Sequence, residues 1–453
     1  MTNPAPPRRE RSPLTLSLGF GHLMWIKRDQ LAFYADMRAR HGDVVRLRLG
    51  PYRSWLLFHP DDVEAVLVHQ WQSFIRFEKL TQVVAQWTGT NMLLAEGDAW
   101  RARRRKVLPA FARQRLPDYG AKAVLHTRRL GEAWAERADD RGEVTIETDA
   151  AMARLTLDIA ADTFFSSPPP PDGDVIEAAI QTLSETAFRE STAPLVLPDW
   201  LPLAAKRRKR RAIGVMDEFV CRLVDARLAE AEGDRGDLLS MLAEQHAGDR
   251  TAIRNDAMSL LIAGHETSGA VLGWTAHCLV QSPLWRERLC AELGAVLQGA
   301  APRPEDLPRL PVLRAVIMEV LRLYPPAYAL FLRRATCDVA MPGFNIRKGD
   351  LVQITPFALH RDPRWFTEPD RFDPDRFLAG EAALPKAYVP FGNGPRICIG
   401  QGFGMMEVCL VVASLLQRWV PVAGPAVVIP EPRFSLRPRG GLAITWRQAG
   451  RAT

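Results

Sequence analysis

The sequence has few cysteines and no long uninterrupted apolar run. Its six cysteines are scattered through 453 residues without paired spacing, which excludes a disulfide framework and predicts a reducing, cytoplasmic location. No segment approaches the roughly 20 apolar residues of a membrane-spanning helix. Residues 1–11 are rich in proline and arginine and contain no apolar stretch, so we expect neither a secretory signal nor a membrane anchor.

Linkers and internal repeats are absent as well. A size of about 150 residues per domain would give three domains for this length. However, no Gly/Ser-rich segment divides the chain, and 47% hydrophobic residues are enough for one large core. We therefore predict a single domain over residues 1–453, with residues 1–13 disordered.

The net charge of +7 raises the question of a nucleic-acid partner. The sharpest basic run is Lys-Arg-Arg-Lys-Arg-Arg at residues 206–211, which could contact phosphates or an anionic membrane surface. No zinc-ligand spacing, recognition-helix pattern or aromatic RNA-binding motif accompanies this run. We therefore interpret it as the solvated start of a helix and expect no nucleic-acid partner.

Helical patterns dominate the chain and strand patterns are few. The expected strands lie at residues 44–49, 55–58, 339–354 and 442–446, the first two forming a β-hairpin around a Gly-Pro turn. Helices are expected to start near residues 59 and 98 and to span residues 121–138 and 256–280. Proline-rich residues 168–171 and 194–202 are predicted to be irregular. The balance predicts a mainly α fold with small β-sheets.

One cysteine stands in an unusual loop. Residues 391–400, Phe-Gly-Asn-Gly-Pro-Arg-Ile-Cys-Ile-Gly, precede an apolar helical run, and this arrangement suits the presentation of one thiolate to a metal. Gly394 and Gly400 would allow tight turns and direct amides at the Cys398 sulfur. The alternative is a buried, inert thiol, and that is the interpretation we prefer for Cys221, Cys278, Cys290 and Cys409.

The apolar segment 256–280 is interrupted by Ala-Gly-His-Glu-Thr-Ser at residues 263–268. Its glycine allows a close approach, and the Thr267 hydroxyl can compete for backbone carbonyls and distort the helix. A carboxyl and a hydroxyl side by side, Glu266 and Thr267, can also pass protons. The alternative is a buried helix with a polar kink.

The five fixed residues of the cysteine loop, Phe391, Gly394, Arg396, Cys398 and Gly400, match the pattern F-x-x-G-x-R-x-C-x-G. The loop resembles the haem-binding loop of the cytochrome P450 superfamily, and such a match should arise by chance about once in 10⁴ chains of this length. Other family motifs follow the same order along the chain. They are G-x-x-W-x-x-x-R at residues 97–104, the central-helix signature at 263–268 and the meander at 369–377.

The resemblance implies a cytochrome P450 fold, mainly α with small β-sheets, in which haem lies between a long central helix and the cysteine loop. Cys398 would be the axial ligand of the iron of haem b (protoporphyrin IX), and a thiolate ligand favours O–O cleavage. Glu266 and Thr267 would be the catalytic residues and would deliver protons to dioxygen. His265 occupies a variable position that points away from the haem.

The resemblance also implies further site residues. The remaining cofactor-binding residues would be Arg396, Trp100, Arg104, Arg333, Phe391, Gly394 and Gly400. Sequence leaves open whether Arg333 or its neighbour Arg334 binds a haem propionate. A buried structural cluster would contain Glu319, Arg322 and Arg376. The substrate pocket would include Ala263, Ala327, Tyr328, Leu330 and Phe331, and residues 194–202 would cover its entrance.

The implied activity is a haem-dependent monooxygenase that inserts one atom of O₂ into an apolar organic substrate by hydroxylation or epoxidation. No flavin or nicotinamide site is recognisable, so electrons would come from a separate ferredoxin or flavodoxin with its reductase. A basic face such as residues 206–211 could dock an acidic electron-transfer protein. The substrate class stays open among terpenoids, fatty acids, steroids and polyketides. A peroxide-using enzyme and a haem-thiolate sensor or carrier are the alternatives.

Overall fold

The structure is a computed structural model that describes residues 10–13, 19–193, 195–229, 235–380 and 384–450. Residues 1–9, for which disorder was predicted, lie outside this part of the chain. Arg11 forms a parallel bridge with Val45, since its amide donates to the Val44 carbonyl at 3.0 Å. The prediction of disorder is therefore wrong at Arg11.

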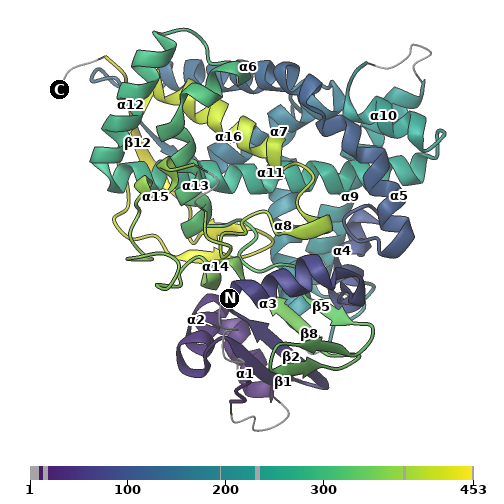
Figure 1. Cartoon of the computed structure of the whole chain (residues 1–453). Helices are drawn as coiled ribbons and strands as arrows, with labels where there is room; N and C mark the ends of the chain where they lie inside the picture. The colour runs from purple at the N-terminus through teal and green to yellow at the C-terminus, as the bar shows by residue number, and fades with distance from the viewer. Residues whose placement is uncertain (1–9, 14–18, 194, 230–234, 381–383, 451–453) are drawn as a thin grey trace.

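Helices make up most of the fold (Figure 1). They are α1 (Phe20–Arg28), α2 (Gln30–His41), α3 (Pro60–Glu64), α4 (Glu78–Thr88), α5 (Gly97–Val107), α6 (Leu116–Ala135), α7 (Thr148–Phe165), α8 (Gly173–Thr192), α9 (Ala204–Ala229), α10 (Leu238–Gln245), α11 (Arg250–Gln281), α12 (Pro283–Leu297), α13 (Pro311–Leu323), α14 (Pro356–Leu359), α15 (Asp375–Leu378) and α16 (Gln401–Leu416). Short 3₁₀ or π turns used below are η2 (Ala65–His69), η4 (Leu108–Phe111), η5 (Arg113–Arg115) and η8 (Gly394–Arg396).

The strands form small sheets. They are β1 (Val44–Leu49), β2 (Tyr52–Leu57), β3 (Phe74–Arg76), β4 (Glu143–Glu147), β5 (Arg333–Ala335), β6 (Val339–Met341), β7 (Phe344–Ile346), β8 (Leu351–Ile354), β9 (Trp419–Ala423), β10 (Pro430–Pro432), β11 (Leu436–Pro438) and β12 (Ala443–Gln448). The largest sheet has the order β1-β2-β8-β5-β3, with β2 and β8 parallel and its other pairs antiparallel. β4, β12 and β9 form a second sheet, and β6-β7 and β10-β11 are antiparallel pairs.

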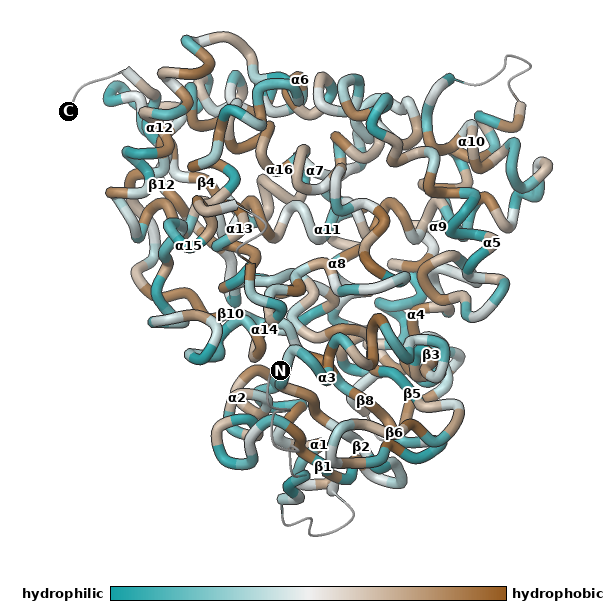
Figure 2. The backbone as a smooth tube through the Cα atoms, viewed as in Figure 1, coloured by the Kyte–Doolittle hydropathy of each residue, from teal (hydrophilic) through white to brown (hydrophobic). Residues whose placement is uncertain are grey.

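The central helix α11 runs through the helical part of the molecule (Figure 1). It begins where the Asp249 side chain accepts hydrogen bonds from the amides of Thr251 and Ala252, at 3.0 and 3.1 Å, which satisfies two of the free N–H groups of its first turn. Gly269 lets α11 approach α7 closely, because a Cβ there would lie 3.1 Å from the Ala153 Cα. The fold thus buries α11 on most sides, and Figure 2 shows the more hydrophobic α16 inside and the hydrophilic α5 near the edge.

Most predicted elements are present. The hairpin at residues 44–57, the strands within 339–354 and the helix starts near 59 and 98 are confirmed. The central helix starts six residues earlier than predicted, at Arg250, and α6 starts at Leu116. Six strands were missed: β3, β4, β5, β9, β10 and β11. All are short, and β3 and β4 pair with strands far away in the sequence, β5 and β12 respectively.

The basic run at residues 206–211 is only partly solvated, which corrects the prediction. Lys206 and Lys209 are buried on α9. The Lys206 Nζ lies 2.5 Å from Glu190 and 2.7 Å from Asp199, and the Lys209 Nζ lies 2.8 Å from each of the same carboxylates. Two of the six cations therefore fasten the connection between α8 and α9, and the exposed charge of this run is carried by arginines.

Within the described ranges, no helix combines the length and apolar character that a membrane crossing requires.

Candidate cofactor site

The loop that carries Cys398 crosses closely over η2. Gly394 has a φ of +71°, and a Cβ at this position would collide with the Leu67 carbonyl oxygen, so only glycine fits here. The Cys398 amide donates to the Phe391 carbonyl at 3.0 Å and closes the loop. Gly400 has a φ of −90°, which any residue can adopt. The prediction of a glycine-dependent turn is therefore confirmed for Gly394 and wrong for Gly400.

Cys398 is the accessible thiol of this loop, just before the N-terminus of α16. Surrounding protein atoms raise the pKa of the thiol, whereas the Gly400 amide and the Arg104 guanidinium act in the opposite direction by favouring the thiolate. The sulfur is thus within reach of a ligand and is placed beside groups that stabilise its charged form. A metal that removes the thiol proton would complete this arrangement.

Arginines that are buried or partly buried gather beside this loop. They are the buried Arg333 on β5 and the partly buried Arg76 on β3, Arg104 on α5 and Arg396 in η8. Burial lowers the pKa of all four. In Arg76 the pKa falls to about 9 and in Arg333 to about 10, because Arg396 adds like-charge repulsion. Glu96 is the carboxylate among them, paired with Arg396 and 3.6 Å from Arg76.

This cluster has more positive charge than its protein partners neutralise. Arg76 Nη1 and Arg333 Nε are buried and have no hydrogen-bond partner among the described residues. Unpaired guanidinium donors inside a protein are costly unless an anion binds them. The donor set therefore fits a cofactor that carries carboxylates at one edge and a thiolate-binding metal, and a haem has both.

Trp100 and Arg104 lie on one face of α5, as predicted. The Arg104 guanidinium lies 5.8 Å from the centre of the Trp100 ring, and the Arg396 guanidinium lies over the same ring at 4.4 Å. Trp100 is buried and packs edge-to-face on Trp71. The tryptophan thus separates and orients two of the cations.

Arg333 and Arg334 have different surroundings. Arg333 is buried within the arginine cluster, whereas Arg334 forms a two-pronged ion pair with Glu78 and is partly exposed. Because the Arg334 guanidinium already has a carboxylate partner, Arg333 is the one that remains available to a cofactor carboxylate.

On α11, the polar segment 263–268 does not interrupt the helix. The Thr267 hydroxyl donates to the Ala263 carbonyl at 2.7 Å, as the sequence predicted, yet the helix continues through it. His265 is fully buried and its Nε2 lies 2.6 Å from Glu177. Burial alone would raise the pKa of Glu177, but His265 outweighs it and lowers that pKa to about 2. His265 is thus held in an ion pair.

Glu266 is buried and partly satisfied. Its Oε1 accepts hydrogen bonds from Ser184 at 2.8 Å and from Ser435 at 3.1 Å, while Oε2 has no hydrogen-bond partner in the described part of the chain. Burial raises the pKa of Glu266, and Arg437 and Ser184 partly offset the rise. A carboxyl with a raised pKa and a free oxygen is suited to take up and release a proton.

A second buried carboxyl links α11 to the helix that follows Cys398. Ser268 donates to Glu407 on α16 at 2.6 Å. Burial raises the pKa of Glu407 to about 8, even though the Ser268 hydroxyl favours its charged form. Glu407 is the single charged residue in the apolar helix 401–416. This isolation was a signal that the sequence interpretation missed.

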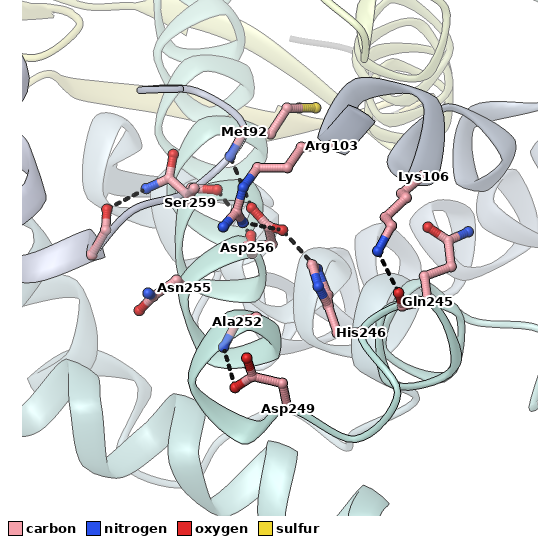
Figure 3. A network of polar contacts seen from close by, with 12 residues as sticks. Met92, Arg103, Lys106, Gln245, His246, Asp249, Ala252, Asn255, Asp256 and Ser259 are labelled. Atoms are coloured by element: carbon pink, nitrogen blue, oxygen red, sulfur yellow. Dashed lines mark hydrogen bonds and ion pairs between the residues drawn. The ribbon is translucent and has the colours of Figure 1, made fainter. Parts of the chain in front are cut away.

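The start of α11 holds the elements around the arginine cluster (Figure 3). The buried Asp256 carboxylate accepts the Met92 amide at 2.8 Å and the Arg103 guanidinium at 3.0 Å. It also lies 2.9 Å from His246 Nε2. Arg103 is next to Arg104, and Met92 precedes the segment whose Ala95 carbonyl and Glu96 carboxylate bind Arg396. Asp256 therefore joins α5 and this segment to α11.

The predicted structural cluster is assembled around α13. Glu319 and Arg322 form a bidentate pair at 2.6 and 2.8 Å, both fully buried. Arg376 Nε lies 3.5 Å from Glu319. The rest of the Arg322 guanidinium donates to the carbonyls of residues 360, 369 and 371, and the Asp373 amide donates to Glu319. This pairing of Glu319 and Arg322 offsets the cost of burying their charges.

The predicted pocket residues do not share one environment. Tyr328 packs with Leu31, Phe357 and Leu436, and its hydroxyl donates to the Arg433 carbonyl at 2.9 Å. Leu330 packs against the cluster that contains β2 and β8 residues. These contacts do not support pocket roles for the two. Phe331 lies beneath the Arg76 guanidinium at 5.0 Å, and Ala263 and Ala327 are partly exposed.

An accessible cysteine beside incompletely paired arginines that are buried or partly buried is a donor set that fits a haem-thiolate protein. The comparison with known families gives the same class. The family model described as Cytochrome P450 matches residues 12–436, and the chain therefore belongs to the cytochrome P450 family. Membership makes it an oxidoreductase, a monooxygenase that acts on organic substrates with O₂ and a redox partner, and implies a haem-thiolate cofactor.

Several curated relatives are similar to this chain over nearly their full length. Cyclooctatin synthase from Streptomyces melanosporofaciens is 35% identical over 438 residues, which cover 91% of this chain and 94% of the relative. Cyclooctat-9-en-7-ol 5-monooxygenase from the same organism is 32% identical over 433 residues, covering 92% and 91%. Pentalenene oxygenase from Streptomyces avermitilis is 29% identical over 426 residues, also covering 92% and 91%.

Proposed function

We propose that the chain binds haem b on Cys398 and inserts one atom of O₂ into an apolar terpenoid substrate, with electrons from a separate ferredoxin or flavodoxin and its reductase. The observation that carries this proposal is the accessible Cys398 thiol beside the arginine cluster. The substrate class is supported by the names of the relatives, which include pentalenene and cyclooctat-9-en-7-ol. A cytoplasmic location remains a prediction from the sequence.

The residues of the chain would hold the cofactor in two ways. Cys398 would ligate the iron, and when bound, the haem supplies the activation of O₂. Arg333, Arg104, Arg396 and the unpredicted Arg76 would bind the propionate carboxylates. Two carboxylates would accept hydrogen bonds from Arg76 Nη1 and Arg333 Nε, which have no partner among the described residues. Their negative charge would also reduce the repulsion from Arg396 that helps to lower the pKa values of Arg76 and Arg333.

Protons would be supplied from α11. Ser184 and Ser435 hold one oxygen of Glu266, and its raised pKa allows the carboxyl to carry a proton. The Thr267 hydroxyl, which donates to the Ala263 carbonyl, can accept a proton from water on its free lone pairs and pass its own onward. A sensor or carrier would need no such pair, and this favours the enzyme over those alternatives.

The first test is the reduced, carbon-monoxide-bound difference spectrum of the purified protein. We expect a strongly red-shifted Soret band in the native chain and in Cys337→Ala, which removes another exposed thiol. The band should be lost in Cys398→Ala. A native protein without haem, or an unchanged spectrum in Cys398→Ala, would overturn the proposal. Substrate turnover with NADH and a surrogate redox pair would then separate an enzyme from a haem-thiolate sensor.

Thr267→Ala tests the proton supply. We expect NADH to be consumed while product per NADH falls by roughly tenfold or more, because a general acid contributes 10²-fold or more to a step that needs it, and the lost electrons should appear as hydrogen peroxide. Thr275→Ala is the matched control, since the Thr275 hydroxyl makes the same bond to a carbonyl four residues back, at 2.7 Å. Equal coupling in both variants would refute the role of Thr267.

A further inference from the structure

Glu96 places one carboxylate among the arginines of the cofactor site. It stands at the N-cap of α5, yet its side chain makes no capping hydrogen bond to that helix. Instead, Oε1 accepts the backbone amide of Arg76 at 3.0 Å and lies 3.6 Å from Nη1 of the same residue. Oε2 pairs with Nη2 of Arg396. The carboxylate therefore turns away from the start of its own helix and toward the arginine cluster.

The arginines around Glu96 repel one another. Arg76 on β3 and Arg333 on β5 are direct partners in an antiparallel pair, so their side chains lie on the same face of the sheet, where like charges are destabilising. Burial and then the repulsion from Arg396 lower the pKa values of both residues, whereas Glu96 raises them. Glu96 therefore offsets the repulsion among three neighbouring guanidinium groups.

The same carboxylate occupies donors that a haem propionate would use. Both terminal nitrogens of the Arg396 guanidinium are engaged, since Nη1 donates to the Ala95 carbonyl at 3.0 Å and Nη2 donates to Glu96. Arg76 Nη1 and Arg333 Nε have no hydrogen-bond partner among the described residues. A propionate that binds these donors would thus come to lie beside a carboxylate that is already bound to the cluster.

We propose that Glu96 is a positioning residue that competes with the haem propionates for Arg396 and Arg76, and that it thereby weakens haem binding and lowers the reduction potential of the haem iron. This inference rests on the proposed function. The negative charge of Glu96 repels the propionates, and it favours ferric over ferrous iron because the ferric ion carries one more positive charge. Glu96 itself touches neither substrate nor iron in this role and acts through the arginines.

The test is Glu96→Gln in the haem-loaded protein, which removes the charge but keeps an oxygen that can accept the Arg76 amide. In a redox titration with dithionite, we expect the ratio of ferrous to ferric iron at a fixed potential to rise roughly threefold or more, which corresponds to about 30 mV for a one-electron couple. Haem transfer to apomyoglobin should become roughly threefold slower or more, because the competing charge is gone. A merely structural role would instead loosen the arginines and speed the loss of haem.

Glu78→Gln is the matched control. Glu78 pairs with Arg334, the neighbour of Arg333, and its removal takes the same charge away without touching the cluster. This variant should keep the native potential and the native rate of haem transfer. Glu96→Asp retains the charge and should return the potential close to the native value. An unchanged potential or faster haem loss in Glu96→Gln, or an equal shift in Glu78→Gln, would overturn the proposal.

The reduced, carbon-monoxide-bound difference spectrum separates this inference from the proposed function. A red-shifted Soret band in the native chain and in all three variants would show that thiolate ligation is intact, so that a missing effect of Glu96→Gln would refute the role of Glu96 alone. Loss of the band in Glu96→Gln only would mean that Glu96 is required for haem binding, which contradicts competition. A native chain that binds no haem would overturn the proposed function and this inference together.

Discussion

At the scale of single residues, Glu407 joins the two halves of the cofactor site. It lies on the helix that follows Cys398 and accepts a hydrogen bond from Ser268, the neighbour of Thr267. Its carboxyl is buried and its pKa is raised to about 8. In the folded protein Glu407 therefore keeps its proton up to about pH 8, whereas in the unfolded chain it loses the proton near its ordinary value of 4.5.

The sign of the resulting pH dependence follows from proton counting. Between pH 4.5 and about 8 the folded state binds more protons than the unfolded state, so a rise in pH favours unfolding. We expect the free energy of unfolding of the native chain, relative to Glu407→Gln, to fall by up to about 1.4 kcal/mol per pH unit in this window. Urea denaturation of both proteins from pH 5 to 9 measures the difference.

A surface variant supplies the comparison for Glu407. Glu132→Gln removes a half-exposed carboxyl whose ion-pair contacts are long, 3.6 Å to Arg128 and 3.8 Å to Arg418, so its stability difference from the native chain should change little with pH. If the difference between the native chain and Glu407→Gln is also constant across the window, Glu407 is ionised in the folded protein and the argument for its protonated state fails.

Arg333 and Arg334 show what a motif alone does not determine at this scale. Both arginines follow the same apolar segment and both belong to β5, where successive side chains face opposite sides of the sheet. Which side faces the cofactor depends on the pairing of β5 with β3 and β8, which are distant in sequence. With this pairing, the Arg333 side chain is buried, whereas the Arg334 side chain lies on the opposite side and forms an ion pair with Glu78.

At the scale of elements, Asp256 fixes the positions of α5 and α10 on α11 (Figure 3). Its carboxylate binds donors from three segments, Met92, Arg103 and His246. Lys106 adds a bond from α5 to the Gln245 carbonyl of α10 at 2.5 Å. The orientation of α5 in turn places Trp100 and Arg104 beside the cysteine loop, so a change at Asp256 should reach the cofactor residues.

We expect Asp256→Asn to destabilise the protein by about 3–5 kcal/mol, the cost of removing one partner from a buried ion pair. The variant should also lose haem faster to apomyoglobin than the native holoprotein does, because α5 is less firmly held. Urea denaturation and the rate of haem transfer measure the two effects. Asp225→Asn is the control, since it breaks an exposed pair with Arg250. An Asp256→Asn protein with native stability and native haem retention would contradict this role.

The helices and the cysteine loop were predictable because their signals are local. The helical spacing of apolar residues and the spacing of Gly394 and Cys398 lie within a few residues of the structure that they define. The Asp249 cap of α11 is a signal of the same local kind, and the prediction missed it. β4 and Glu96 could not be found in this way. β4 exists because it pairs with β12, about 300 residues later, and Glu96 matters because the fold brings Arg396 to it.

At the scale of the whole molecule, two of the exposed basic surfaces are candidates for docking a redox partner. The basic run at 206–211 was the sequence candidate for docking an electron-transfer protein, but it lies on α9, which packs on α8, α10 and α11. A second basic surface lies on α5, the helix that carries Arg104, and on the η4 and η5 turns that follow it. It consists of the exposed Arg101, Arg105 and Arg113 with the exposed Leu108, and we call it the α5 surface.

If the redox partner is the acidic ferredoxin or flavodoxin of the proposed function, we expect it to dock on the α5 surface rather than on α9, because electrons must reach the neighbourhood of Cys398. Arg104 on the same helix is close enough to favour the Cys398 thiolate. Phe111, which ends η4, would lie 3.6 Å from a Cβ at Gly400. Exposed arginines at such a place raise the rate of encounter with an acidic partner, and salt screens this effect.

We expect R101Q/R105Q/R113Q to lower the rate of electron transfer from an acidic ferredoxin by roughly tenfold or more at low salt and to flatten its dependence on ionic strength. Stopped-flow reduction of the holoprotein over a range of salt concentrations measures both quantities. R207Q/R208Q/R211Q carries the same change in net charge on the α9 surface and should be reduced at the native rate. Equal slowing by the two variants would mean that net charge alone steers the partner, and no slowing by either would place the docking site elsewhere.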